Sequence, residues 1–314
     1  MSNAKDKPET VSLYQFFQRI PDEEAARLYF ENNRWASEAN CGHCGSLNVH
    51  ECKDHKPMPY RCRDCRKHFS VRTGTVLAES RLPLHKWLMA IYMMTTARKG
   101  IPSTQMAREL GITQKSAWFL AQRIRETWLS GSDEGPMGDD VQVDETYIGG
   151  KERNKHGSKK LRAGRGPVGK TAVLGIRDEN AQVRATPVAD TSAPTLTSYI
   201  KANVNEGSYV TTDEHGAYRG LRADGFKHHS VNHSAGEYVR NFCIHTNGIE
   251  SFWALLKRGH YGVYHYMSPK HLHRYVSEFA FRQNTAQDGT MRFIEKTVAR
   301  MIGKRLIYEG LINA

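Results

Sequence analysis

The chain has 314 residues, of which 39% are hydrophobic and 10% aromatic, and it carries a formal net charge of +12 at pH 7. This length provides for two or three modules with cores of their own, and the excess of positive charge favours a polyanionic partner. No apolar stretch approaches the ~20 residues that span a bilayer, and no secretory signal is visible at the N-terminus, so a membrane-spanning chain is not expected.

The first part of the chain is predicted to contain a helical segment followed by a small metal-binding module. Residues 10–36 place apolar side chains at helical spacing. The next module, residues 37–75, is rich in Cys, Gly, His and Arg and poor in aliphatic side chains. Such a segment cannot fold on a hydrophobic core alone, so we expect a metal to stabilise it.

Four cysteines in this module form two Cys-x-x-Cys pairs. Cys41 and Cys44 make the first pair, and Cys62 and Cys65 make the second after an interval of seventeen residues. Pairs at this spacing are typical of a zinc ribbon, in which four thiolates enclose one Zn²⁺ and leave no position for water. The predicted zinc is therefore structural. Several Arg and Lys residues around the second pair either contact phosphate or form a solvated turn.

Residues 82–130 are predicted to form a helix-turn-helix DNA-binding domain. Gly111 suits the left-handed turn between the helices, and Thr113 suits the N-cap of the second helix. The second helix carries four polar residues that we expect to reach a groove or backbone phosphates, namely Gln114, Lys115, Arg123 and Arg125. An ordinary helical hairpin uses the same capping and packing, and it remains the alternative.

From residue 138 to 290 the pattern indicates a catalytic domain in which strands precede and alternate with helices, followed by a helical tail at 291–314. The predicted strands begin at Asp139 and continue at 171–177, 182–188 and 208–212, and the predicted helices span 194–204 and 246–258. This order is that of a ribonuclease-H-like core, a mixed sheet with flanking helices. The stretch 151–170 has eight Lys or Arg residues against one acid and is predicted to be a loop or a long hairpin tip that becomes ordered on DNA.

Three acidic residues stand where such a core would place metal ligands. Asp144 and Asp213 each end an apolar run, and Glu250 lies in the predicted helix 246–258. Two strand-end carboxylates and one from a helix can hold two divalent cations about 3.5–4 Å apart. Asn247 and Lys257 share a helix face with Glu250, so the lysine is expected to address a phosphate at the same site.

Three stretches resemble the DDE-type transposases of bacterial insertion sequences, in the zinc-ribbon group known as insertion-sequence family fifteen-ninety-five. They read VQVDETYIGG at 141–150, TTD at 211–213 and HTNGIESFWALLKRGHYG at 245–262. The resemblance implies a multidomain α/β protein of the bacterial cytoplasm, associated with the nucleoid, with a ribonuclease-H-like core after a zinc ribbon and a helix-turn-helix. It also implies two Mg²⁺ or Mn²⁺ ions, binding to double-stranded DNA at transposon ends and targets, cleavage with strand transfer, and a homodimer or higher oligomer on DNA.

By the same resemblance, Asp144, Asp213 and Glu250 are the metal carboxylates and Lys257 is the basic residue of the site. The group also includes members with Asn as the third residue, so Asn247 is the alternative to Glu250, and Glu278 is a weaker one. Two other functions are consistent with parts of the sequence. One is a DNA-binding regulator with an inactive ribonuclease-H-like fold, and the other is a general nuclease.

Overall fold

The computed structural model describes residues 8–36, 38–129, 135–150, 152–161, 167–231 and 245–313. Its contacts divide the chain into two compact units. Unit 1 contains the chain up to Trp128 together with the segment from Thr285 onward, and unit 2 is Leu129–Asn284. In the described part of the chain, no helix has both the length and the apolar character that a membrane crossing requires.

Unit 1 begins with two helices, α1 (Leu13–Arg19) and α2 (Glu23–Trp35). The sequence predicted one helical segment over 10–36, but Pro21 lies between the two helices, and Asp22 starts the second by accepting a hydrogen bond from the backbone N–H of Ala25 at 2.8 Å. A three-stranded antiparallel sheet follows, with the order β1 (Val49–Glu51), β2 (Tyr60–Cys62) and β3 (His68–Phe69). Its apolar cluster is small and includes Cys41 and Cys62 themselves.

Three helices continue unit 1, namely α3 (Leu84–Thr96), α4 (Ser103–Leu110) and α5 (Gln114–Thr127). Gly111 ends α4 with φ 58° and ψ 50°, in the left-handed region, as the sequence predicted. Thr113 caps α5 by accepting a hydrogen bond from the backbone N–H of Ser116 at 3.2 Å. These two residues set the tight turn between α4 and α5.

The C-terminal helices α9 (Gly289–Ala299) and α10 (Tyr308–Asn313) complete unit 1. Thr290 joins the two ends of the chain, because its N–H donates to Glu9 O at 2.9 Å and its Oγ1 accepts from the Val11 N–H at 3.1 Å. The Trp128 indole N–H also donates to Thr297 Oγ1 at 3.0 Å. The core of unit 1 is therefore built from segments more than 150 residues apart in the chain, since 169 positions separate Trp128 from Thr297.

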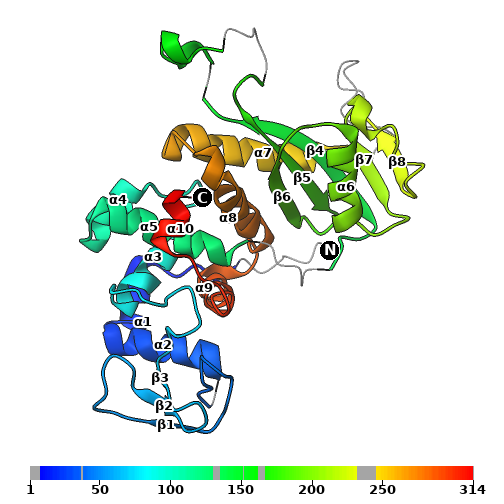
Figure 1. The fold of residues 1–314 in the computed structure, drawn as a ribbon. Coiled ribbons are helices and arrows are strands. Elements are labelled where there is room, and N and C mark those ends of the chain that lie inside the picture. The colour runs from blue at the N-terminus through cyan, green and yellow to red at the C-terminus, as the bar shows by residue number, and fades with distance from the viewer. Residues whose placement is uncertain are drawn as a thin grey trace, which may run out of the picture. The chain divides into compact units, whose positions relative to one another are not determined.

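Unit 2 is built on a five-stranded mixed sheet (Figure 1). Its strands are β4 (Asp140–Ile148), β5 (Thr171–Asp178), β6 (Val183–Val188), β7 (Tyr209–Thr212) and β8 (Lys227–Ser230). They lie in the order β6-β5-β4-β7-β8, with antiparallel pairing among the first three and parallel pairing of β4 with β7 and of β7 with β8. The sequence did not predict β8.

Helices lie on both faces of this sheet. They are α6 (Ala193–Asn203), α7 (Asn247–Gly259) and α8 (Leu272–Asn284). One apolar cluster joins α6 to Val143 and Leu174, and the other joins α7 and α8 to Val173 and Ile148. Because successive strand residues point to opposite faces, the split between Val173 and Leu174 makes unit 2 a three-layer α/β/α arrangement. Shorter elements are 3₁₀ turns at Glu152–Asn154, Gly157–Lys159, Gly216–Tyr218 and Pro269–His271, and a π-helical turn at His260–Tyr264.

Candidate functional sites

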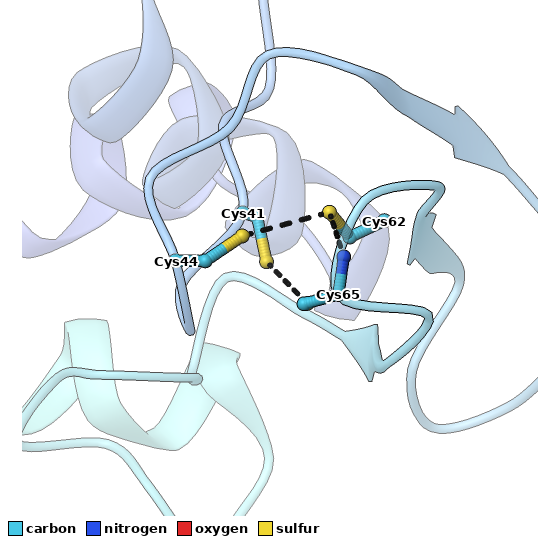
Figure 2. A group of neighbouring side chains, drawn as sticks. All are labelled: Cys41, Cys44, Cys62 and Cys65. Atoms are coloured by element: carbon cyan, nitrogen blue, oxygen red, sulfur yellow. Dashed lines mark hydrogen bonds between the residues drawn. The ribbon is translucent and has the colours of Figure 1, made fainter.

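The four predicted cysteine ligands converge in unit 1, with Cys41 and Cys44 in the turn before β1, Cys62 at the end of β2 and Cys65 in the turn after β2 (Figure 2). Their sulfur atoms all lie within 4.8 Å of one another, with Cys41 Sγ to Cys65 Sγ at 3.6 Å and Cys44 Sγ to Cys62 Sγ at 3.7 Å. A tetrahedral Zn²⁺ with Zn–S bonds of about 2.3 Å requires sulfur atoms about 3.8 Å apart. The four thiols therefore have the spacing that fits one zinc ion.

Backbone N–H groups also point at these sulfur atoms. The N–H of His43 donates to Cys41 Sγ at 3.4 Å, and the N–H of Cys65 donates to Cys62 Sγ at 3.5 Å. Backbone hydrogen bonds, with that from Cys65 as the largest contribution, lower the pKa of the Cys62 thiol to about 7. The backbone thus stabilises the thiolate form of Cys62, whereas desolvation and hydrogen bonds with the other thiols raise the pKa of Cys44 and of Cys65 in the metal-free site.

In unit 2, the sheet register places Asp144 and Asp213 side by side. The parallel β4–β7 pairing matches Asp140 with Tyr209, Val141 with Val210 and Gln142 with Thr211. Continued by two residues, this register brings Asp144 next to Asp213, at the point where β7 ends. The sequence had suggested that Asp144 ends its strand. Because β4 continues to Ile148, Asp144 instead lies within the strand. Asp213 lies at the carboxyl end of β7, where parallel strands of α/β sheets commonly bind ligands, and Asp144 lies beside it in the middle of β4.

The carboxyl group of Asp144 lies in an acidic and partly buried environment. Desolvation, followed by the negative charges of Glu145 and Asp213, raises the pKa of Asp144 to about 7. Trp253 donates its indole N–H to Asp144 Oδ2 at 3.0 Å, which opposes part of that shift. Carboxylate oxygens are the donors that Mg²⁺ and Mn²⁺ prefer, so the chemistry of Asp144 and Asp213 suits a hard divalent cation.

The other predicted residues of the site are on α7, which lies over β4 and β5. Glu250 is exposed in the first turn of the helix, and Thr246 donates its hydroxyl to Glu250 Oε1 at 2.8 Å. Asn247 is exposed at the first position of the helix, and Lys257 is half-buried in its last turn. By contrast, Glu278 is fully buried on α8 and bonded to Arg282 at 2.7 Å, which makes it a core charge and not a candidate ligand.

The carboxylates are not as close together as the thiols. Across the described parts of the chain, the four cysteines are the one group of three or more His, Cys, Asp or Glu side chains whose ligand atoms all lie within 4.8 Å. Asp144 and Asp213 interact electrostatically, and α7, which carries the exposed Glu250, packs on the same face of the sheet. Mutual repulsion opposes closer approach of carboxylates that share no cation.

Glu145 is a neighbour of this site that the sequence reasoning missed. Its side chain is 8% exposed and accepts a hydrogen bond from the Tyr218 hydroxyl at 2.5 Å, and it lies 3.9 Å from His215 Nδ1. The backbone N–H of His215 in turn donates to Asp213 Oδ1 at 3.0 Å. Glu145 therefore anchors the turn that follows β7 and carries Asp213. The sequence did hold a signal for this role, because Glu145 directly follows Asp144. Successive side chains of a strand point to opposite faces of the sheet, so Glu145 had to lie on the face opposite Asp144.

The four predicted DNA-contacting residues of α5 fall into two groups. Gln114 and Lys115 are exposed at the start of the helix, where Gln114 Nε2 donates to Ser103 Oγ at 2.9 Å and Lys115 Nζ lies 4.5 Å from the ring centre of Tyr308. Arg123 and Arg125 are buried, with 5% and 2% of their surface exposed. The structure does not support direct DNA contact by these two arginines, since the second half of α5 is enclosed by unit 1.

Arg123 has a structural environment of its own. It donates to Ala78 O at 2.6 Å, and its guanidinium lies 5.1 Å from the ring centre of Trp87 and 5.3 Å from that of Phe119. Burial lowers its pKa to about 10. These contacts identify Arg123 as a buried cation that joins α5 to α3 and to the chain before α3.

The basic stretch 151–170 is described at 152–161 and 167–170, while Lys151 and residues 162–166 lie outside the described residues. Its described part contains two 3₁₀ turns and an ion pair of 2.6 Å between Lys155 and Glu152. In the same stretch, Lys160 is exposed and Lys170 is half-buried. The predicted ordering of the stretch on DNA remains a prediction.

Comparison with known proteins relates both units to mobile DNA elements. Residues 136–284 match the family described as the ISXO2-like transposase domain, and residues 21–68 match the transposase zinc-ribbon domain. A protein of Halobacterium salinarum, described as an uncharacterized protein in transposable element ISH50, is 29% identical over 280 residues. The aligned region covers 84% of this chain and 91% of that protein.

Proposed function

Because the chain belongs to the transposases of insertion-sequence family fifteen-ninety-five (IS1595), we propose that it binds the terminal inverted repeats of an insertion sequence and catalyses metal-dependent DNA cleavage and strand transfer. The observation that carries this proposal is the register of β4 and β7, which aligns Asp144 with Asp213 below the helix that bears Glu250. The reaction belongs at the nucleoid in the cytoplasm, on a homodimer or higher oligomer bound to DNA.

The fold assignment follows the same observations. A central first strand, two antiparallel strands on one side and two parallel strands on the other support a ribonuclease-H-like core for unit 2. The left-handed Gly111 between α4 and α5, with α3 packed on both, supports a helix-turn-helix in unit 1. In this proposal the first two turns of α5 enter a DNA groove, because Gln114 and Lys115 are exposed there.

We propose Asp144, Asp213 and Glu250 as the ligands of two Mg²⁺ or Mn²⁺ ions, with Asn247 as the alternative third residue. Such a metal pair, when bound, activates one oxygen and stabilises another during in-line attack on phosphorus. The protein side chains hold the carboxylates in place, and Lys257 neutralises charge on the phosphate. No covalent protein intermediate is required.

The decisive experiment uses the full chain, a labelled duplex that carries the element's own terminal repeat, and Mg²⁺. We expect a cut at the transposon end and then joining of the new 3′ end to a second duplex. Cutting without joining would indicate a general nuclease. Binding without either reaction would indicate a DNA-binding regulator with an inactive core.

A further inference from the structure

The indole of Trp253 connects the two secondary-structure elements that carry predicted metal ligands. Trp253 lies on α7 three residues after Glu250, is 3% exposed, and donates its Nε1–H to Asp144 Oδ2 at 3.0 Å. The hydrogen bond therefore joins the helix that carries Glu250 to the strand that carries Asp144. A buried indole N–H is a donor that requires a partner, and here the partner is a carboxylate of the candidate site.

A glycine on the neighbouring strand makes this contact possible. Gly175 on β5 pairs directly with Asp144 on β4. A Cβ at Gly175 would lie 2.6 Å from both Cη2 and Cζ2 of Trp253 and 3.0 Å from Ile249 Cδ1. Real Cβ atoms are essentially never this close to other heavy atoms. The ring of Trp253 occupies the space that any other residue at 175 would fill, so the hydrogen bond to Asp144 depends on this glycine.

A second contact fixes the start of α7 on the same strand. Gln142 Oε1 accepts the backbone N–H of Ile249 at 3.0 Å, and Gln142 Nε2 lies 3.3 Å from His245 Nδ1. A Cβ at Gly248 would lie 2.6 Å from Gln142 Oε1 and 2.0 Å from an Arg177 nitrogen, so the helix and the strand approach closely here as well. Two side chains of β4 that are two residues apart, and therefore on one face, thus bond to successive turns of α7.

We propose that Trp253 is a positioning residue that orients the Asp144 carboxylate for metal binding and that Gly175 is the residue that admits its ring. A carboxylate accepts at about four positions, so one hydrogen bond to Oδ2 fixes its plane and leaves the other positions for metal. This inference rests on the proposed function, in which Asp144 is a metal ligand.

The test compares Mn²⁺ binding by zinc-loaded full-length proteins, measured from the paramagnetic resonance signal of the free ion. Trp253→Phe keeps an aromatic ring but removes the N–H donor, and we expect about a 10- to 100-fold loss of Mn²⁺ affinity, the usual effect of losing a group that orients a ligand. Trp128→Phe is the matched control, because Trp128 is 2% exposed and donates to Thr297 at the same 3.0 Å in unit 1. Its Mn²⁺ affinity should equal that of the wild type.

A second measurement does not depend on the substitution of Trp253. Of the five tryptophans, at positions 35, 87, 118, 128 and 253, Trp253 is the one in unit 2. Mg²⁺ should therefore change the tryptophan emission of the wild type and of Trp128→Phe.

The role of Gly175 is tested with the Mn²⁺ measurement. Gly175→Ala should weaken Mn²⁺ binding although Trp253 is retained. Gly220→Ala, where a Cβ meets no atom within 4 Å, should not weaken it.

The outcomes separate this inference from the proposed function. If the wild type binds Mn²⁺ and Trp253→Phe binds it equally well, the positioning role is refuted while the metal site stands. Equal losses in Trp253→Phe and Trp128→Phe would indicate general destabilisation and would also refute it. If the wild type binds no Mn²⁺ apart from the cysteine site, the metal ligands themselves are wrongly assigned.

Discussion

Asp144, Asp213 and Glu250 carry the proposed chemistry through their negative charge, so substitutions that remove charge but keep size test them most directly. Asp144→Asn, Asp213→Asn and Glu250→Gln should each reduce Mg²⁺-dependent cleavage at least 100-fold, because a neutral amide is a weaker ligand for a hard cation. Gel-shift measurements with the terminal repeat should show nearly unchanged binding, because the ribbon and α5 belong to unit 1.

Two further variants test the roles of Asn247 and Lys257. Asn247→Ala should retain most cleavage if Glu250 is the third metal ligand. Lys257→Ala should be impaired less than the three carboxylate variants, since Lys257 contacts phosphate and not metal in the proposal. An inactive Asn247→Ala together with an active Glu250→Gln would assign the third position to Asn247. Normal cleavage by all three carboxylate variants would exclude the two-metal site.

The raised pKa of Asp144 makes the stability of the metal-free protein depend on pH. Its pKa is near 3.8 in the unfolded chain and about 7 in the folded one, so the unfolded state releases its proton first as the pH rises. The free energy of unfolding should therefore decrease between about pH 4 and 7. Asp144 should contribute up to roughly 4 kcal/mol to this decrease, since a pKa difference of one unit corresponds to about 1.4 kcal/mol.

Denaturant unfolding in a chelator-free, Mg²⁺-free buffer at pH 5 and pH 8 measures this effect. Asp144→Asn should lose most of the difference between the two pH values and should be the more stable protein at pH 8. Identical pH dependence in the two proteins would show that Asp144 ionises normally in the folded state.

The sequence predicted the four cysteine ligands better than it predicted which side chains are exposed. The paired cysteines depend on local spacing, and the four sulfur atoms converge as expected. Arg123 and Arg125 were expected at a DNA surface, but their burial depends on packing against distant segments, such as the contact of Arg123 with Ala78. Helical periodicity in a single segment does not report what packs around that helix.

The three-stranded sheet β1–β3, which is stapled by the four cysteines in the predicted zinc site, has too small an apolar cluster to fold without a metal. Metal analysis should find about one Zn²⁺ per chain. Cys62→Ser should unfold this sheet, because thiolate binding supplies its folding free energy, and unit 2 should remain folded. Near-UV circular dichroism together with limited proteolysis would follow both parts. One iron per chain, or no metal in protein purified without chelators, would contradict this prediction.

Helix α5 offers a comparison between an exposed and a buried cation. Lys115→Ala should weaken DNA binding and reduce its salt dependence while changing stability by less than about 0.5 kcal/mol. Arg123→Ala should instead lower stability by about 2–4 kcal/mol, because it removes a large buried side chain from Trp87 and Phe119. Fluorescence anisotropy with terminal-repeat DNA and thermal unfolding measure the two effects. If Arg123→Ala lost DNA affinity without losing stability, the arginine would contact DNA.

The sequence predicted most long elements of unit 2 within a few residues, because their apolar patterns are regular. It did not predict β8, since the four residues Lys227–Ser230 show no apolar alternation and pair only at the edge of the sheet. It also did not reveal the bond between Trp253 and Asp144, because residues 109 positions apart meet only after the sheet and α7 have assembled.

Unit 1 is formed from two segments that are far apart in the chain, up to Trp128 and from Thr285 onward, and its stability should depend on both. Removal of the chain from Thr285 onward takes away Thr290 and Thr297, the partners of Val11 and Trp128. We expect the shortened protein to lose the cooperative unfolding transition of unit 1 and to bind terminal-repeat DNA at least 10-fold more weakly. Differential scanning calorimetry would resolve the two units, and an unchanged unit 1 transition would contradict the expectation.

The joining of the two chain ends at Thr290 also sets the order of events during synthesis. A ribosome that adds about 5–20 residues per second needs roughly 8–30 s to make Leu129–Asn284, and only then does it produce α9 and α10. Throughout that interval the first 128 residues lack the partners that complete their core, while unit 2 already has its whole sequence. Unit 1, to which the proposed function assigns DNA binding, is therefore the last part to mature, and under that proposal a nascent chain still on its messenger cannot yet hold a transposon end.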